Sequence, residues 1–198
     1  LAYKEFKKTF GDDGSVMVVG INSEKIHQLS FFNKWYDLTH ELDSTTNIKQ
    51  VLSIANLKSL EKETVMEYYE ADSFSTSKFH AQDFVQAKPQ TQAELDSLFG
   101  ALKNLRFYEG LLFKDSSDFS LMAITLDKKI LDTKGRVAFV SGLQEKIEKV
   151  CAEEKVEVHF SGLPFIRTKM SKMIQQELVQ FTLISMLITS LILLFFFR

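Results

Sequence analysis

The segment LVQFTLISMLITSLILLFFF, residues 178–197, decides how the rest of the chain is interpreted. It carries no charged side chain, and Arg198 follows it directly. An α-helix of this length spans about 30 Å, which is the thickness of the hydrocarbon core of a bilayer. Its Ser and Thr hydroxyls can bond to carbonyls of their own helix and therefore tolerate lipid. We predict one transmembrane helix; the alternative, a buried core helix, is disfavoured because core helices are seldom apolar on every side.

The residues before this segment have the size of one domain. The 198-residue chain has 24 basic and 26 acidic residues and a formal net charge of −2, so no basic field points to nucleic acid. Its single cysteine, Cys151, excludes an internal disulfide framework and a cysteine-based zinc site. Because the chain starts with Leu and no loop follows the apolar segment, we expect it to be part of a longer polypeptide.

Patterns that carry enzymatic chemistry are missing from the sequence. The four histidines (27, 40, 80, 159) are scattered, and none belongs to an H-E-x-x-H pattern. The chain contains neither a G-x-S-x-G elbow nor a P-loop. We therefore predict a protein that is not an enzyme and that uses no cofactor or metal.

The run VMVVGI at 16–21 predicts a central strand that is buried on both faces. After it we expect a helix to about Leu42, because apolar residues recur there at helical spacing in two adjacent stripes. The stripes are Phe31, Trp35, Leu38 and Leu42, and Ile26, Leu29, Phe32 and Tyr36. So wide an apolar arc indicates packing on a sheet and under a loop. The alternative is that the helix, with Trp35, also meets a substrate, a neighbouring domain or a subunit.

A second strand is predicted at 48–57 from alternating side chains, and the following stretch, 58–90, has no clear period. Its three phenylalanines, Phe74, Phe79 and Phe84, lie five residues apart, a spacing that matches neither helix nor strand. Long connections are often functional. We expect a loop whose aromatic side chains pin it to the domain surface, or a hydrophobic lip where these phenylalanines touch a ligand or membrane.

The next part of the chain predicts a helix followed by a hairpin. Thr91 and Glu94 form a capping box, and apolar residues then follow one helical face to Leu105. Apolar residues at 111–113 and 119–126 flank a turn, which indicates two antiparallel strands.

A helix capped by Asp132 or Thr133 comes next, and alternation at 156–160 predicts a final strand. Without an insertion at about 58–106, the order is β-α-β-β-α-β, the split β-α-β or ferredoxin-like plan. We therefore predict an α+β domain over 16–161, with helices on one face of an antiparallel sheet. The opposite face would need cover by another domain, the insertion or a subunit.

Residues 161–164, Ser-Gly-Leu-Pro, end the last strand just before the membrane helix. Glycine allows a close backbone approach, and proline suits the first turn of a helix. We predict a junction over 162–177 in which Gly162 and Pro164 form a hinge that passes movement between strand and membrane helix. The first 15 residues are expected to be an amphipathic segment with a short helix at 1–10.

Several local stretches, in this order, resemble the resistance-nodulation-division (RND) exporters, especially the Patched-like and lipid-exporter branch. They are FGDD at 10–13, FYEGLL at 107–112, SGLPFIR at 161–167 and the closing FFFR at 195–198. The resemblance covers the whole chain. It implies an extracytoplasmic ferredoxin-like porter domain that follows a first membrane helix and leads into the second, which would be 178–197.

The resemblance also implies a function, an exporter driven by the proton gradient that moves lipids or other hydrophobic compounds. The location would be the inner (cytoplasmic) membrane of a bacterium, with the soluble domain in the periplasm. The implied partners are the lipid bilayer, the remaining membrane helices and a second porter module of the same polypeptide. A homo-oligomer is compatible with the sequence. The proton-carrying carboxylates would lie in other helices, because 178–197 has no ionisable side chain.

One feature of the charge distribution opposes this placement. Arg167, Lys169 and Lys172 lie on the domain side of the apolar segment, and the positive-inside rule places such clusters in the cytoplasm. We keep the extracytoplasmic placement because the resemblance implies it. Two other functions also stay open, a membrane-anchored extracytoplasmic sensor or partner-binding module and an accessory factor of protein secretion.

Overall fold

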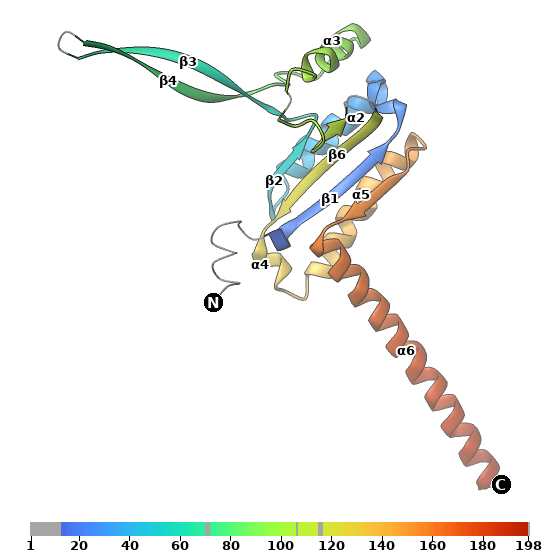
Figure 1. Cartoon of the computed structure of the whole chain (residues 1–198). Coiled ribbons are helices and arrows are strands. Elements are labelled where there is room, and N and C mark those ends of the chain that lie inside the picture. Colours follow the sequence, from blue (N-terminus) through green and yellow to red (C-terminus); the bar gives the residue numbers. More distant parts are fainter. Residues whose placement is uncertain (1–12, 70–71, 106, 115–116, 198) are drawn as a thin grey trace.

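The computed structural model describes the backbone of residues 13–69, 72–105, 107–114 and 117–197, and the side chains of most of them, those of 60–81 excepted. Figure 1 shows a mixed α+β body, a long two-stranded hairpin projecting from it, and a C-terminal helix that leads away from the body. The helix predicted at 1–10 lies outside the described residues.

The body is built on an antiparallel sheet with the strand order β2-β6-β1-β7, and β5 pairs with the beginning of β6. The strands are β1 (Val16–Asn22), β2 (Ile48–Ser53), β5 (Phe113–Lys114), β6 (Ser117–Leu126) and β7 (Val158–Ser161). β1 pairs with β6 on one side and with β7 on the other, so the predicted central position of the VMVVGI run is confirmed. The prediction that it is buried on both faces is wrong, because Val16 and Val18 lie on the face without a helix and are only half-buried.

Two long helices, α2 (Leu29–Asp43) and α5 (Arg136–Glu153), cover one face of the sheet (Figure 1). Alternate residues are buried on the face toward these helices, from Met17 to Ile21 in β1 and from Ser120 to Leu126 in β6. The largest fully buried side chains include Trp35, Phe31, Phe32, Met17, Ile21, Leu42 and Met122. The stripe of α2 that contains Trp35 therefore supplies the centre of the core.

The opposite face of the sheet has no helix over it within the described part of the chain (Figure 1). Val18, Leu121, Ala123 and Leu52 lie on this face, since Val18 pairs with Ala123 and Ala123 with Leu52. Their side chains are half-buried. The sheet thus presents a moderately apolar surface, as the predicted one-sided arrangement of helices requires.

Two helices, α2 and α5, begin later than the sequence suggested. Ser23 caps only a short 3-10 helix, η2 (Glu24–His27), and Gln28 in an extended conformation separates it from α2. Asp127 caps the short α4 (Lys128–Leu131), and α5 then starts after Gly135. The caps predicted at Asp132 and Thr133 are wrong, because Thr133 ends the α4 turn through a hydroxyl bond to the Ile130 carbonyl at 2.9 Å.

β2 ends at Ser53 and does not reach 57. The amide of Asn56 donates to the Val51 carbonyl at 2.6 Å, and the Ser53 N–H donates to the Asn56 side-chain oxygen at 2.8 Å. These two bonds fold the chain into a turn and stop the strand.

The prediction of an irregular loop at 58–90 is wrong for most of its length. β3 (Lys58–Tyr69) and β4 (Asp72–Asp83) pair without a break from Lys58–Asp83 to Tyr69–Asp72. The hairpin projects from the body, so no face of it needs the apolar alternation that reveals a strand packed on a core (Figure 1).

The helix predicted after Thr91 is confirmed as α3 (Gln92–Leu102). The Thr91 hydroxyl accepts a bond from the Glu94 N–H at 3.3 Å, as a capping box requires. The Glu94 carboxylate accepts from the N–H of Gln90 at 2.8 Å, one residue earlier than in the usual box.

Candidate functional site: the junction between the sheet and the membrane helix

The helix that contains the apolar segment begins directly at the end of the sheet. α6 (Leu163–Phe196) contains 34 residues, and Gly162 alone separates it from β7. The predicted junction, 162–177, and the predicted span, 178–197, therefore lie almost entirely within one continuous helix. Among the described residues it is the only helix long and apolar enough to cross a membrane, and its apolar part is exposed throughout.

The two threonine hydroxyls inside the apolar part of α6 are bonded along the helix, as expected from the sequence. The Thr182 hydroxyl donates to the Leu178 carbonyl at 2.8 Å. The Thr189 hydroxyl does the same to the Ser185 carbonyl, also at 2.8 Å. Both hydroxyls are therefore already hydrogen-bonded, which is compatible with burial in lipid.

Gly162 occupies a position that accepts no other residue without strain. Its φ of +99° lies in the region that only glycine adopts readily. A Cβ at this position would collide with the backbone oxygen of Val16 and would lie 3.1 Å from the Cα of Met17. The start of α6 is thus pressed against the backbone of the central strand.

The first two turns of α6 are held by side chains as well. Pro164 and Thr168 are buried against the body, and the Phe165 ring stacks on Phe160 of β7 with 5.5 Å between ring centroids. The Lys169 ammonium lies 6.0 Å from the centre of the Phe165 ring. The joint is clamped, and this favours transmission of force over free rotation.

Both predicted hinge residues, Gly162 and Pro164, lie in this joint. The sequence did not indicate that Val16 supplies a backbone wall or that Phe160 and Phe165 stack across the break. The spacing of those two aromatic residues around Gly-Leu-Pro was the available signal in the sequence. It predicts a contact between the two rings only once the strand register is known.

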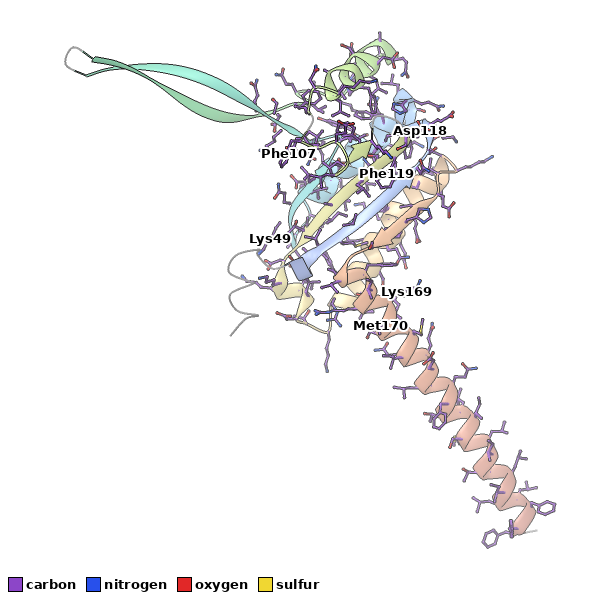
Figure 2. The ribbon with its side chains drawn as sticks, viewed as in Figure 1. Lys49, Phe107, Asp118, Phe119, Lys169 and Met170 are labelled. Atoms are coloured by element: carbon purple, nitrogen blue, oxygen red, sulfur yellow. The ribbon has the colours of Figure 1, made fainter. Side chains whose placement is uncertain are left out.

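Charged side chains cover α6 only near the body. Arg167, Lys169 and Lys172 are exposed, and Glu177 is the last ionisable residue before the apolar part. Figure 2 shows Lys169 and Met170 where the helix leaves the body. The charges therefore lie in a collar between the sheet and the apolar part of the helix.

The aromatic residues predicted as substrate or interface contacts do not gather at one place. Trp35 is fully buried in the core, with its ring centroid 6.1 Å from that of Phe31, so it offers no surface to a substrate. Phe84 is partly buried against the core. Phe74 and Phe79 belong to β4, and their side chains lie outside the described residues.

The described residues also lack a group of three or more His, Cys, Asp or Glu side chains that could hold a metal ion. The only cysteine, Cys151, is buried in α5, and burial raises the pKa of its thiol to about 11. A thiol with such a pKa is a poor nucleophile at neutral pH.

No family model, curated protein or solved structure matches this chain. Function is therefore inferred from the geometry of the joint, the open sheet face and the membrane helix.

Proposed function

We propose that this chain is the porter-domain part of an RND-type exporter, in which α6 is the second membrane helix and carries motion between the membrane and the sheet. The observation that carries the proposal is the joint at Gly162. A displacement of α6 must move β7 and β1, because no flexible linker separates them and the first helical turns are packed on the body.

The strand order supports the porter fold that the proposal needs. α2 connects β1 to β2, α5 connects β6 to β7, and the neighbouring strands are antiparallel. A ferredoxin-like domain with the β3–β4 hairpin and α3 as an insertion would have this order. The half-exposed face of the sheet provides a surface on which a second porter module of the same polypeptide would pack.

The proposal places the body outside the cytoplasm, in the periplasm of a bacterium, with α6 in the inner membrane. The exported compounds would be lipids or other hydrophobic molecules, and other membrane helices would carry the proton-binding carboxylates. The chain itself would act without catalysis, cofactor or metal.

A membrane-anchored partner-binding module is the second candidate. The projecting β3–β4 hairpin and the open sheet face favour it, because both present surface to another molecule (Figure 1). In that case α6 would only anchor the body, and its stiffness would not matter.

The experiment that separates the two candidates softens α6 between the joint and the membrane. Met170 and Met173 are exposed in this part of the helix, so replacing both by Gly removes no buried contact. Each Gly destabilises the helix by about 1 kcal/mol relative to Ala. The matched control replaces both residues by Ala. The intact polypeptide is reconstituted in liposomes, and efflux of a hydrophobic dye is measured with and without a proton gradient.

We expect gradient-driven efflux in the native protein and the Ala variant, and a clear loss in the Gly variant at equal expression. Equal efflux by the two variants would show that α6 does not transmit motion. Absence of any response to the gradient in the native protein would reject the exporter and favour the binding module.

A further inference from the structure

The register of the β3–β4 hairpin assigns its residues to two faces of different character. Residues that lie directly opposite each other in an antiparallel pair share a face, and the face alternates along each strand. β3 and β4 pair without a break from Lys58–Asp83 to Tyr69–Asp72, so the backbone alone fixes the face of each paired residue. Even positions of β3 share one face with odd positions of β4, and the remaining paired residues form the other face.

One of the two faces, here called the charged face, is suited to water. It contains Glu61, Glu63 and Glu67 of β3 and Asp72, Lys78 and His80 of β4. Glu63 lies opposite Lys78 in the pairing, so opposite charges meet across the two strands. Such pairs stabilise two strands on a face that is exposed to solvent.

The other face, here called the neutral face, contains a single charged residue between 60 and 81, Lys62. A two-stranded hairpin on its own is only marginally stable in water and gains stability when one face packs on another surface. The hairpin projects from the body, so the body does not cover this face along most of its length (Figure 1). The neutral face therefore needs cover from a second molecule.

The neutral face has large residues on one strand and small residues on the other. At three of its levels a large residue of β3 pairs with Ala or Ser of β4: Leu60 with Ala81, Met66 with Ser75 and Tyr68 with Ser73. Such a face is complementary to itself when a twofold axis runs along the hairpin, because β3 of each copy then lies over β4 of the other. Lys62 then lies at the level of Phe79 of the second copy, where an ammonium can lie over the ring.

We propose that two copies of this chain associate through the neutral faces of their β3–β4 hairpins. The hairpin follows β2 and α6 follows β7, and these two strands run in opposite directions, so hairpin and α6 leave the sheet at opposite ends (Figure 1). A twofold axis along the hairpin keeps both copies pointing in the same direction, as two chains anchored in one bilayer by α6 require. The inference does not rest on the export proposal, because association needs neither a proton gradient nor transmission of motion by α6.

The size of this interface decides where association occurs. Two strands of 12 residues, at about 3.4 Å per residue and about 5 Å apart, present a face of roughly 400 Å² per copy. Two such faces bury about 800 Å² in total, less than the ~1,200 Å² of a stable interface in solution. Anchoring by α6 confines both copies to one bilayer and raises their effective concentration. We therefore expect dimers in membranes and mainly monomers in dilute detergent.

The test uses the full chain in phosphatidylcholine liposomes, with single cysteines introduced on the hairpin. Met66 lies on the neutral face, and its neighbour Val65 lies on the charged face, so Met66→Cys and Val65→Cys form a matched pair. A bismaleimide with a short spacer links two copies, and gel electrophoresis measures the linked dimer. Native Cys151 is buried and remains in each variant, so the chain without a new cysteine gives the background.

We expect Met66→Cys to give about tenfold more linked dimer than Val65→Cys, because adjacent residues of a strand point to opposite faces. Equal amounts of dimer from the two variants would reflect random collision in the bilayer and would overturn the proposal. Absence of linked dimer from Met66→Cys would overturn it as well.

A charge placed on each face provides an independent test that needs no new cysteine. Ser75→Asp puts a carboxylate on the neutral face, and Thr76→Asp puts one on the charged face. Association in liposomes is measured by energy transfer between copies that carry a donor or an acceptor dye on an N-terminal tag. Burial of an unpaired carboxylate is costly, so Ser75→Asp should reduce association by about tenfold or more, whereas Thr76→Asp should leave it unchanged. Equal energy transfer in the two variants would show that the neutral face does not form the interface.

Discussion

At the scale of single residues, Gly162 is the residue that the joint between β7 and α6 requires. It combines a positive φ with a backbone contact to Val16, and each alone would exclude a side chain. Gly142, in contrast, lies on a helix where a Cβ meets open space. The two glycines look alike in the sequence, and only their backbone surroundings separate a structural requirement from a replaceable residue.

Replacing Gly162 by Ala is therefore expected to destabilise the body by about 3 kcal/mol, since both backbone strain and a collision arise. Gly142→Ala should instead stabilise it by about 1 kcal/mol through helix propensity. Unfolding can be followed in detergent by the fluorescence of Trp35, the only tryptophan, which is buried in the core and reports on the body without a contribution from α6. Equal midpoints for the two variants would show that the joint is not tightly packed.

At the scale of elements, the sequence predicted those parts whose pattern reflects a packed environment. The VMVVGI run predicted the central strand, Thr91 predicted the start of α3, and the apolar segment predicted a helix long and apolar enough to cross a membrane. The sequence patterns did not predict the β3–β4 hairpin or the short turns after β1, β2 and β6. Of the candidate site, Gly162 and Pro164 could be found, whereas the stack of Phe160 on Phe165 depends on tertiary contacts that no local pattern encodes.

The hairpin is expected to be dispensable for folding of the body, because β3 and β4 pair with each other and its base has separate bonds. At the base, the Phe84 N–H donates to the Leu57 carbonyl at 2.8 Å, and the Tyr108 hydroxyl donates to the Lys58 carbonyl at 3.0 Å. Replacing 60–81 by Asn-Gly, a favoured two-residue turn, should change the free energy of unfolding by less than about 1 kcal/mol.

The measurement is denaturant unfolding followed by Trp35 fluorescence, with the native chain as reference. A large loss of stability would mean that the hairpin packs on the body, contrary to its projecting position in Figure 1.

At the scale of the whole molecule, the length of α6 sets how far the body stands from a bilayer. α6 leaves from one end of the sheet and leads away from the body (Figure 1). A helix of 34 residues is about 50 Å long, but the hydrocarbon core needs only about 30 Å. The charged collar ends at Glu177, so the excess length lies on the side of the body.

These lengths predict where the bilayer meets α6. Residues 163–177 should lie outside the hydrocarbon, and the free segment 169–177, beyond the turns packed on the body, should hold the body about 13 Å above it. Cysteines introduced singly at Met170, Leu183 and Leu187 would carry nitroxide labels for accessibility measurements in liposomes. The label at Met170 should be accessible to a water-soluble nickel chelate, and the labels at the two leucine positions to oxygen dissolved in the lipid. The boundary between water and lipid accessibility should lie close to Leu178.

The native thiol provides an internal control for this measurement. Cys151 is neutral at pH 7.5, because burial raises its pKa to about 11, and its thiolate fraction grows only as the pH approaches that value. The unmodified chain should therefore take up almost no label at pH 7.5. If the label at Met170 instead met only lipid-dissolved oxygen, the body would rest on the membrane surface, and α6 would have no free segment through which its motion could reach the sheet.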